Sequence, residues 1–241
     1  MSKFGSNYRE DNASGSALVY ILIAIALLAA LTVSFMEPSG QQSQNQNSTR
    51  VVSDIYNQAS LIQSAIQECV LLYPSEDNGL TSDEQKHSPY PINPADSYFD
   101  DEGATDGSAS DNNVSNIRCP GNPGGSDPDH SFLFSGSSGK FLPQPPSLFE
   151  DWEYYNGDDG VFFFIQTDKS DPFLRTALEK VDDKFSECEA DIIDATSGDV
   201  ALSSDSIGDS SVRECPSGSR CFRVWMIIDS ATNHGDVVDC P

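Results

Sequence analysis

The sequence predicts an α+β protein. One long N-terminal helix, with a transmembrane half followed by an amphipathic half, packs on an antiparallel β-sheet head. Three observations predict it: an apolar run over residues 16–36, helical spacing of apolar residues over 51–73, and short strand-like runs mixed with helical patterns further on. We expect one or two extra helices in the head, and disulfides that stabilise it.

The same observations divide the chain into five segments. They are a leader (1–15), a transmembrane helix (16–36), the second part of the long helix (37–73), an acidic loop region (74–130) and an α+β head (131–241). The net charge is -25; of the 38 acidic and 13 basic residues, 36 and 11 follow the apolar run, because only Lys3, Arg9, Glu10 and Asp11 precede it. Such a field repels phosphate backbones, so we expect no binding of nucleic acid.

The apolar run is long enough to cross a membrane. Ser16–Met36 carries no charge and only Thr32 and Ser34 as polar residues late in the run. As a helix it measures about 31 Å, close to the ~30 Å hydrocarbon core of a bilayer. The side chains expected to anchor it in lipid are Leu18, Tyr20, Ile21, Ile25, Leu28 and Leu31.

The flanks of the run predict its orientation. Lys3 and Arg9 precede it and Glu37 follows it, which places the N-terminus in the cytoplasm. We therefore expect a single-pass protein of the inner membrane with a periplasmic or extracellular head. A secretory signal peptide is the competing interpretation, but its apolar core is shorter and a small-residue cleavage site follows it, whereas Glu37-Pro38-Ser39-Gly40 comes next here.

A second helical pattern follows a polar patch, Gln41–Asn47. Ser48 or Thr49 is expected to cap its start, and Pro74 to end it. Its apolar positions are Val51, Val52, Ile55, Tyr56, Ala59, Ile62, Ala65, Ile66, Cys69, Val70 and Tyr73. A surface helix of any globular domain explains this stripe equally well, but not its place directly after the apolar run.

In the head, residues 74–130 are rich in Pro, Gly, Asp, Ser and Asn, and form either an ordered loop or a partly disordered one. Ordered structure is expected to resume at Phe132. The expected elements are a buried strand at Val161–Ile165, a helix from Asp171-Pro172 to about Cys188, and strands at Asp199–Leu202 and Cys221–Ile228.

The six cysteines all follow the apolar run, and they allow fifteen pairings. Their spacing favours Cys69 with Cys119, Cys215 with Cys221, and Cys188 with Cys240. Six unpaired thiols are the alternative. A zinc site is disfavoured, because the chain contains no C-x2-C pair.

No residue pattern indicates catalysis. His87, His130 and His234 stand far apart in loop-like sequence and are expected to be exposed. We therefore expect no enzyme and no cofactor. Calcium is a weaker expectation at two acidic clusters that do not fit the EF-hand pattern, and a solvated acidic surface is the alternative. The candidate ligands are Asp100, Asp101, Asp106, Asp158 and Asp159.

The junction before the apolar run carries a resemblance to a known family. A polar leader ends in Gly15, and the small residue Ser16 opens the apolar helix. Over about residues 10–73 this resembles the prepilins of type IV pili and the pseudopilins of type II secretion. The resemblance implies cleavage by a prepilin peptidase between Gly15 and Ser16, methylation of Ser16, and retention of the membrane helix. Pro38 matches a helix-kinking proline that pilins often carry.

Tyr20 departs from the family pattern, which usually has glutamate at this position. In the family that carboxylate is thought to pair with the amino terminus of a neighbouring subunit, where an unpaired ammonium is costly. Some minor pseudopilins, notably those at the filament tip, also lack it. The resemblance therefore implies a minor or tip-proximal subunit.

The function expected from this resemblance is structural: a subunit of a type IV pilus-like or type II secretion filament, serving protein transport in the latter. Its expected partners are other pilin-like subunits, the prepilin peptidase and the inner membrane. The alternative is a single-pass membrane protein whose head binds a ligand or acts as a sensor. A third interpretation is an exported enzyme with an acidic cleft.

Overall fold

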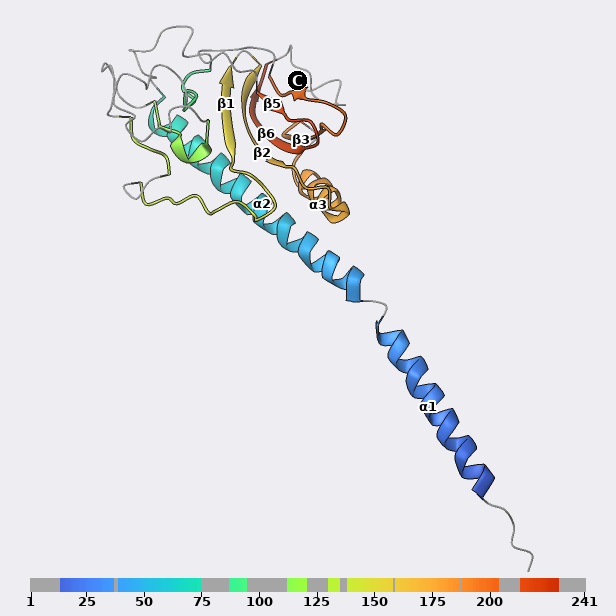
Figure 1. Ribbon diagram of the computed structural model, residues 1–241. Coiled ribbons are helices and arrows are strands. Elements are labelled where there is room, and N and C mark those ends of the chain that lie inside the picture. Colours follow the sequence, from blue (N-terminus) through green and yellow to red (C-terminus); the bar gives the residue numbers. More distant parts are fainter. Residues whose placement is uncertain are drawn as a thin grey trace, which may run out of the picture. The chain divides into compact units, whose positions relative to one another are not determined.

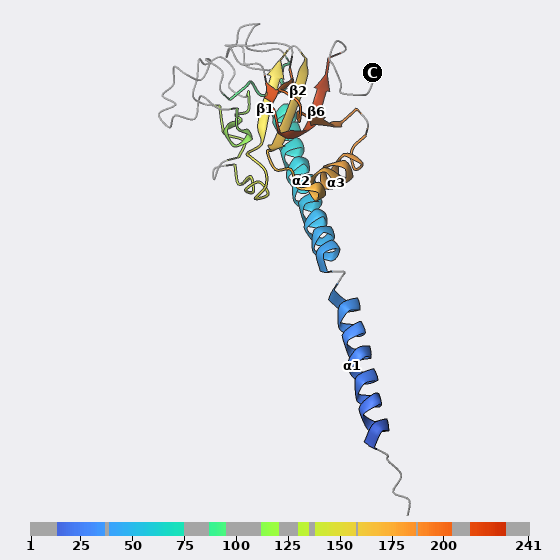
Figure 2. The same ribbon diagram turned by 45° about the vertical axis from the view of Figure 1, so that its right-hand side comes forward.

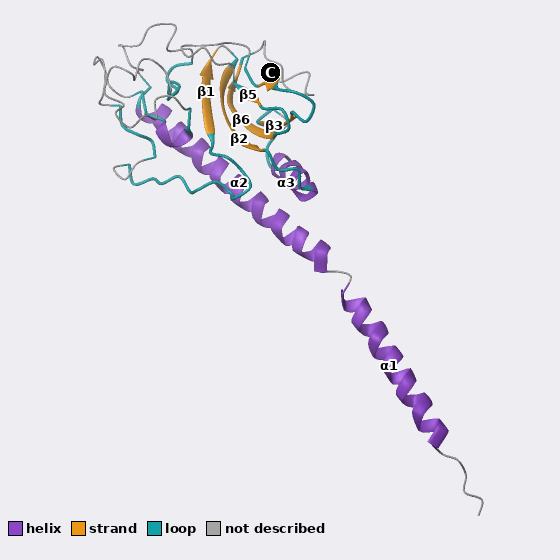
Figure 3. Cartoon of the chain, viewed as in Figure 1, coloured by secondary structure: helices purple, strands orange, loops and turns teal. Residues whose placement is uncertain are grey.

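The computed structural model describes residues 14–36, 39–74, 87–94, 112–120, 130–134, 138–157, 159–186, 188–203 and 213–229. The chain divides into two units, Met1–Gln46 and Asn47–Pro241, and each is described by itself. The elements follow one another as two helices, a short 3-10 turn, and then six strands and a third helix in the head (Figures 1 and 3).

The first unit contains α1, Ser14–Met36. All side chains of residues 17–32 are exposed. Within the part of the chain that the structure describes, no helix is both long and apolar enough to cross a membrane. The helix that the sequence predicts is present, and its transmembrane character stays a prediction.

The second helix, α2, runs over Ser39–Leu72. The predicted end before Pro74 is confirmed, but the predicted start at Ser48 or Thr49 is wrong. The polar patch Gln41–Asn47 is helical as well, because glutamine is a good helix former and extension of an existing helix costs little compared with nucleation.

The head contains a four-stranded antiparallel sheet, which confirms the α+β class and the antiparallel sheet of the prediction. Its order is β1-β2-β6-β3, with β1 at Glu153–Gly157, β2 at Gly160–Thr167, β3 at Ala190–Asp194 and β6 at Arg220–Ile228. The remaining elements are the helix α3 (Pro172–Asp182), the 3-10 turn η2 (Val114–Asn116) and a small two-stranded sheet of β4 (Val200–Ala201) and β5 (Glu214–Cys215).

The strands predicted at Val161–Ile165 and Cys221–Ile228 are the centres of β2 and β6, and β4 lies inside the predicted Asp199–Leu202. The predicted helix to Cys188 is too long, since α3 ends at Asp182. A turn after Asp182 still brings Phe185 to the core, with its ring 5.8 Å from that of Phe222. The helical spacing of Phe185 therefore reflected its burial and not a continuing helix.

Gly160 permits the close approach of β2 to β6. Its φ is +128°, and a Cβ built there would lie 2.3 Å from the carbonyl oxygen of Ile227 on β6. The register of β2 against β6 shifts between Val161 and Phe162, as in a β-bulge. Only glycine lets the two backbones approach this closely.

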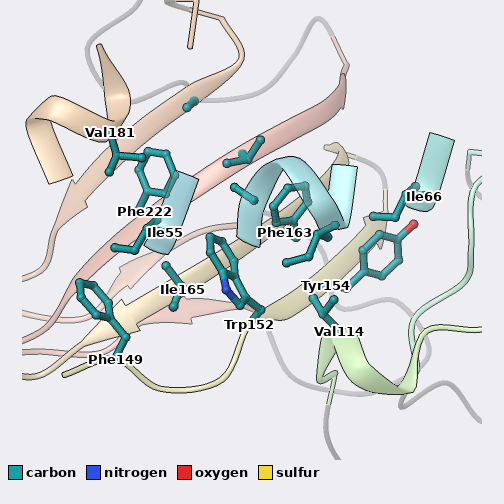
Figure 4. Close-up of a cluster of buried hydrophobic side chains, with 14 of the residues drawn as sticks. Ile55, Ile66, Val114, Phe149, Trp152, Tyr154, Phe163, Ile165, Val181 and Phe222 are labelled. Atoms are coloured by element: carbon teal, nitrogen blue, oxygen red, sulfur yellow. The ribbon is translucent and has the colours of Figure 1, made fainter. Parts of the chain in front are cut away.

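Both faces of the sheet are covered and contribute to the hydrophobic core. On one face, α2 and α3 pack against alternate residues of the strands, among them Phe163, Ile165 and Phe222. Figure 2 shows these two helices beside the sheet, and Figure 4 shows Ile55 and Ile66 of α2 among the aromatic rings of this core. On the other face, Phe162 and Trp225 meet edge to face, with ring centroids 4.8 Å apart, in a smaller cluster that includes the Cys215–Cys221 disulfide.

Two predicted disulfides are confirmed. Cys69 bonds Cys119 across 50 residues, and Cys215 bonds Cys221 across six. Cys188 is also disulfide-bonded. Its expected partner, Cys240, lies outside the described residues.

Candidate functional site

The candidate site is the pair of helices α1 and α2, because the sequence predicts that assembly would use them. The predicted anchor side chains lie on α1, and each is between 58% and 70% exposed; they are Leu18, Tyr20, Ile21, Ile25, Leu28 and Leu31. Gly15 and Ser16 lie in the first turn of the same helix. α1 is therefore an apolar helix whose described side chains are not covered by other residues of its own unit.

The C-terminal part of α2 contrasts with α1. Its apolar residues at helical spacing, from Val51 to Cys69, are buried against the sheet, as the amphipathic pattern predicts. The opposite stripe, including Ser53, Asn57 and Gln67, is exposed. Burial of this stripe fixes α2 to the head along most of its length.

Gln58 is the polar exception in this packed stripe, and only 6% of it is exposed. Its Oε1 accepts a hydrogen bond from Trp152 Nε1 at 2.8 Å, and its Nε2 donates to the Gln144 carbonyl oxygen at 2.8 Å. The amide thus joins α2 both to the start of β1 and to the segment before it. Because both hydrogen bonds form only at one position of the helix, the Gln58 amide fixes where α2 lies on the head.

Further contacts hold α2 on the head on either side of Gln58. At the C-terminal end of α2, the Cys69–Cys119 disulfide and an ion pair between Lys140 Nζ and Glu68 Oε1 at 2.8 Å join the helix to two loops. Further towards its N-terminus, Tyr56 packs on Phe185 with ring centroids 5.6 Å apart. Covalent, ionic and aromatic contacts therefore hold α2 at several positions along the helix.

Of the five candidate calcium ligands, Asp159 is the one among the described residues. Asp159 lies in the β1–β2 turn, is 6% exposed, and its carbonyl oxygen accepts the Asp229 N–H at 3.1 Å. Asp100, Asp101, Asp106 and Asp158 lie outside the described residues. Among the described residues, no group of three or more acidic, histidine or cysteine side chains is placed to hold a metal.

The expectation for the histidines is wrong for His130, which is only 4% exposed. It directly precedes the segment 131–133 that pairs with 117–119, and this pairing draws it into the head. His87 is partly exposed, and His234 lies outside the described residues.

Sequence reasoning missed a buried ion pair on the second face of the sheet. Arg223 on β6 donates from Nε to Asp191 Oδ1 on β3 at 2.9 Å, and from Nη1 to the Leu202 carbonyl oxygen at 2.7 Å. Its guanidinium also lies 4.3 Å from the ring centroid of Trp225. The only sequence signal was an arginine inside the apolar run Cys221–Ile228.

Asp182, at the end of α3, lies near this pair. Its partial burial, together with the negative charges of Asp191 and Asp183, raises the pKa of its carboxyl group to about 6. The charge of Asp182 therefore depends on pH near neutrality.

Comparison of the chain with protein-family models, with curated proteins and with solved structures gives no match.

Proposed function

We propose that this chain is a structural, non-enzymatic subunit of a type IV pilus-like or type II secretion filament, in a minor or tip-proximal position. The observation that carries the proposal is the arrangement of the two helices. An apolar helix with exposed side chains is followed, after Pro38, by a helix whose apolar stripe is buried in an acidic, disulfide-bonded head.

In this proposal α1 lies in the inner membrane before assembly. The exposed side chains from Leu18 to Leu31 contact lipid there, and neighbouring apolar helices in the filament. The transfer exchanges one apolar environment for another, so it costs little in desolvation. Tyr20 supplies no carboxylate for a neighbouring amino terminus, which fits a subunit at the end of the filament.

The head follows α1 because α2 is firmly attached to it. Gln58, the Cys69–Cys119 disulfide and the buried apolar stripe hold α2 on the sheet. In the proposed filament, α2 therefore keeps the head attached to the helical part of the chain that follows α1. This is the mechanical property that a filament subunit requires.

The mature N-terminus tests the proposal. The full chain is produced in a Gram-negative host that carries a prepilin peptidase, and the intact mass of the membrane-extracted protein is measured. We expect a chain that begins at Ser16 with one added methyl group. Gly15→Ala is expected to abolish this cleavage and leave membrane insertion intact, while Gly40→Ala, a glycine beyond the apolar run, leaves cleavage unchanged.

A chain that keeps Met1 in this host contradicts the filament proposal and favours a membrane-anchored ligand-binding or sensor head. A soluble head cleaved after Met36 contradicts both, because it loses the apolar helix. Equal processing of Gly15→Ala and the unaltered chain contradicts the proposed cleavage position.

A further inference from the structure

A groove of about 520 Å³ lies between α2 and the segment that precedes β1. One wall is the face of α2 from Asn47 to Gln58, the other is the segment Pro143–Leu148, and Phe173 of α3 contributes to the lining. Figures 1 and 2 show the segment before β1 passing beside α2. Its volume is within the range of sites that hold a short peptide segment or a small molecule.

The proline-rich wall limits what the groove can recognise. Pro143, Pro145 and Pro146 have no backbone N–H, so this wall cannot add a strand to a ligand as a sheet edge does. Three of its carbonyl oxygens are already used, since that of Gln144 accepts from Gln58, that of Pro146 from the Phe149 N–H and that of Leu148 from the Thr167 hydroxyl. Recognition must therefore rely on side chains and on the remaining backbone groups.

Arg50 is the cation in the lining of the groove, and Asp54 is the anion. The Arg50 side chain is 84% exposed, and its ion pair with Asp54 is long, with Nε and Oδ2 3.7 Å apart. Such a pair is weak in water, so the guanidinium keeps donors for a carboxylate that binds in a bidentate manner. Val51, Leu148 and Phe173 offer apolar surface beside it.

We propose that this groove binds an extended acidic segment of a neighbouring subunit in the filament. A carboxylate of that segment pairs with Arg50, and an adjacent apolar or aromatic side chain contacts Val51, Leu148 and Phe173. This inference rests on the proposed function, because it takes the partner to be another subunit.

Charge complementarity selects this occupant. A chain of net charge -25 packs against a similar neighbour only where its few cations face the neighbour's carboxylates. A membrane surface is disfavoured, because anionic headgroups repel such a head. The required chemistry occurs in this chain itself, in the sequence Tyr98-Phe99-Asp100-Asp101-Glu102, where aromatic residues directly precede carboxylates.

The test uses the full chain in detergent micelles and a fluorescent peptide of residues 97–102, with blocked ends, as the probe. A second peptide carries Asn, Asn and Gln in place of the three acidic residues. Fluorescence anisotropy is expected to detect binding of the acidic peptide that weakens as salt is raised, and binding of the neutral peptide at least about tenfold weaker.

Two arginine variants locate the binding. Arg50→Glu is expected to lower the affinity for the acidic peptide at least about tenfold. Arg175→Glu is the matched control, because Arg175 is also an exposed helical arginine that pairs with a carboxylate four residues later, and it does not line the groove. We expect this control to bind as the unaltered chain does.

Equal affinity for the two peptides, or an equal loss in both arginine variants, overturns the proposal. So does unchanged binding by Arg50→Glu. The measurement needs neither cleavage at Gly15 nor a filament, so failure of the groove proposal and failure of the filament proposal are distinguishable.

Discussion

Trp152 Nε1 donates a hydrogen bond of 2.8 Å to Gln58 Oε1, across 94 residues of sequence. Both side chains are buried, and the bond lies between the amphipathic helix and the start of the sheet. Apolar packing alone tolerates small shifts of a helix along a sheet, whereas a buried donor and acceptor must meet at one position. The pair therefore fixes the placement of α2 that the proposed function requires.

Replacement of Gln58 tests this role. Gln58→Leu keeps the volume but leaves the Trp152 indole N–H and the Gln144 carbonyl oxygen without their partner, and we expect a loss of about 2 kcal/mol in the free energy of unfolding. Gln67→Leu changes an exposed glutamine of the same helix and is expected to stay within about 0.5 kcal/mol. Urea unfolding followed by tryptophan fluorescence measures both. Equal losses would refute the special role of Gln58.

The two described disulfides are predicted to differ in their effect on stability. Cys69–Cys119 closes 50 residues and Cys215–Cys221 closes six. Loop-closure entropy then predicts a loss of about 4 kcal/mol for the double serine variant at Cys69 and Cys119, and about 2 kcal/mol for that at Cys215 and Cys221. Thermal unfolding of each double variant measures the difference. The reverse order would show that local packing, and not loop closure, governs these bonds.

The sequence predicted the parts of the fold whose periodicity is strong. The stripe from Val51 to Cys69 and the apolar centres of β2 and β6 are in their expected elements. It did not predict β1 or β3, because Tyr154 and Tyr155 are both buried, on opposite faces of the sheet, and β3 is a five-residue edge strand with aspartates at two positions. Alternation of polar and apolar residues is absent in both.

In the candidate site, α1 could be predicted from the sequence because its apolar residues are consecutive. The partners of Gln58 and Arg223 could not be predicted, because they lie far away in sequence and their contacts arise from the sheet order β1-β2-β6-β3. The buried position of His130 has the same origin, in a pairing between two loops. Long-range pairing carries no local sequence signal.

Arg223 and Arg220 lie three residues apart on β6 and offer a comparison of a buried ion pair with a more exposed one. Arg223→Met leaves Asp191 as a buried charge without its partner, so we expect a loss of about 3 kcal/mol or more. Arg220 pairs with Asp194, whose side chain is 37% exposed compared with 11% for Asp191, and Arg220→Met is expected to cost below about 1 kcal/mol. Chemical denaturation at neutral pH measures the loss in both variants. Similar losses would contradict the conclusion that the Arg223 ion pair contributes more to stability than the Arg220 pair.

Asp182 is expected to make the stability of the head depend on pH. Because partial burial and the charges of Asp191 and Asp183 raise its pKa to about 6, the folded state holds a proton that the unfolded state releases near pH 4. This group therefore favours the folded state below about pH 4, and its contribution is lost as pH rises to about 6.

Asp182→Asn removes the unfavourable charge. We expect it to raise the free energy of unfolding by about 1 kcal/mol at pH 7, a value reduced for the solvent screening of a half-buried group, and by much less at pH 4. Asp171→Asn is the control, because Asp171 is exposed and its side chain makes no capping hydrogen bond to α3. Urea unfolding at the two pH values measures both variants. A gain for Asp182→Asn that is equal at pH 4 and pH 7 would show that the effect is not electrostatic.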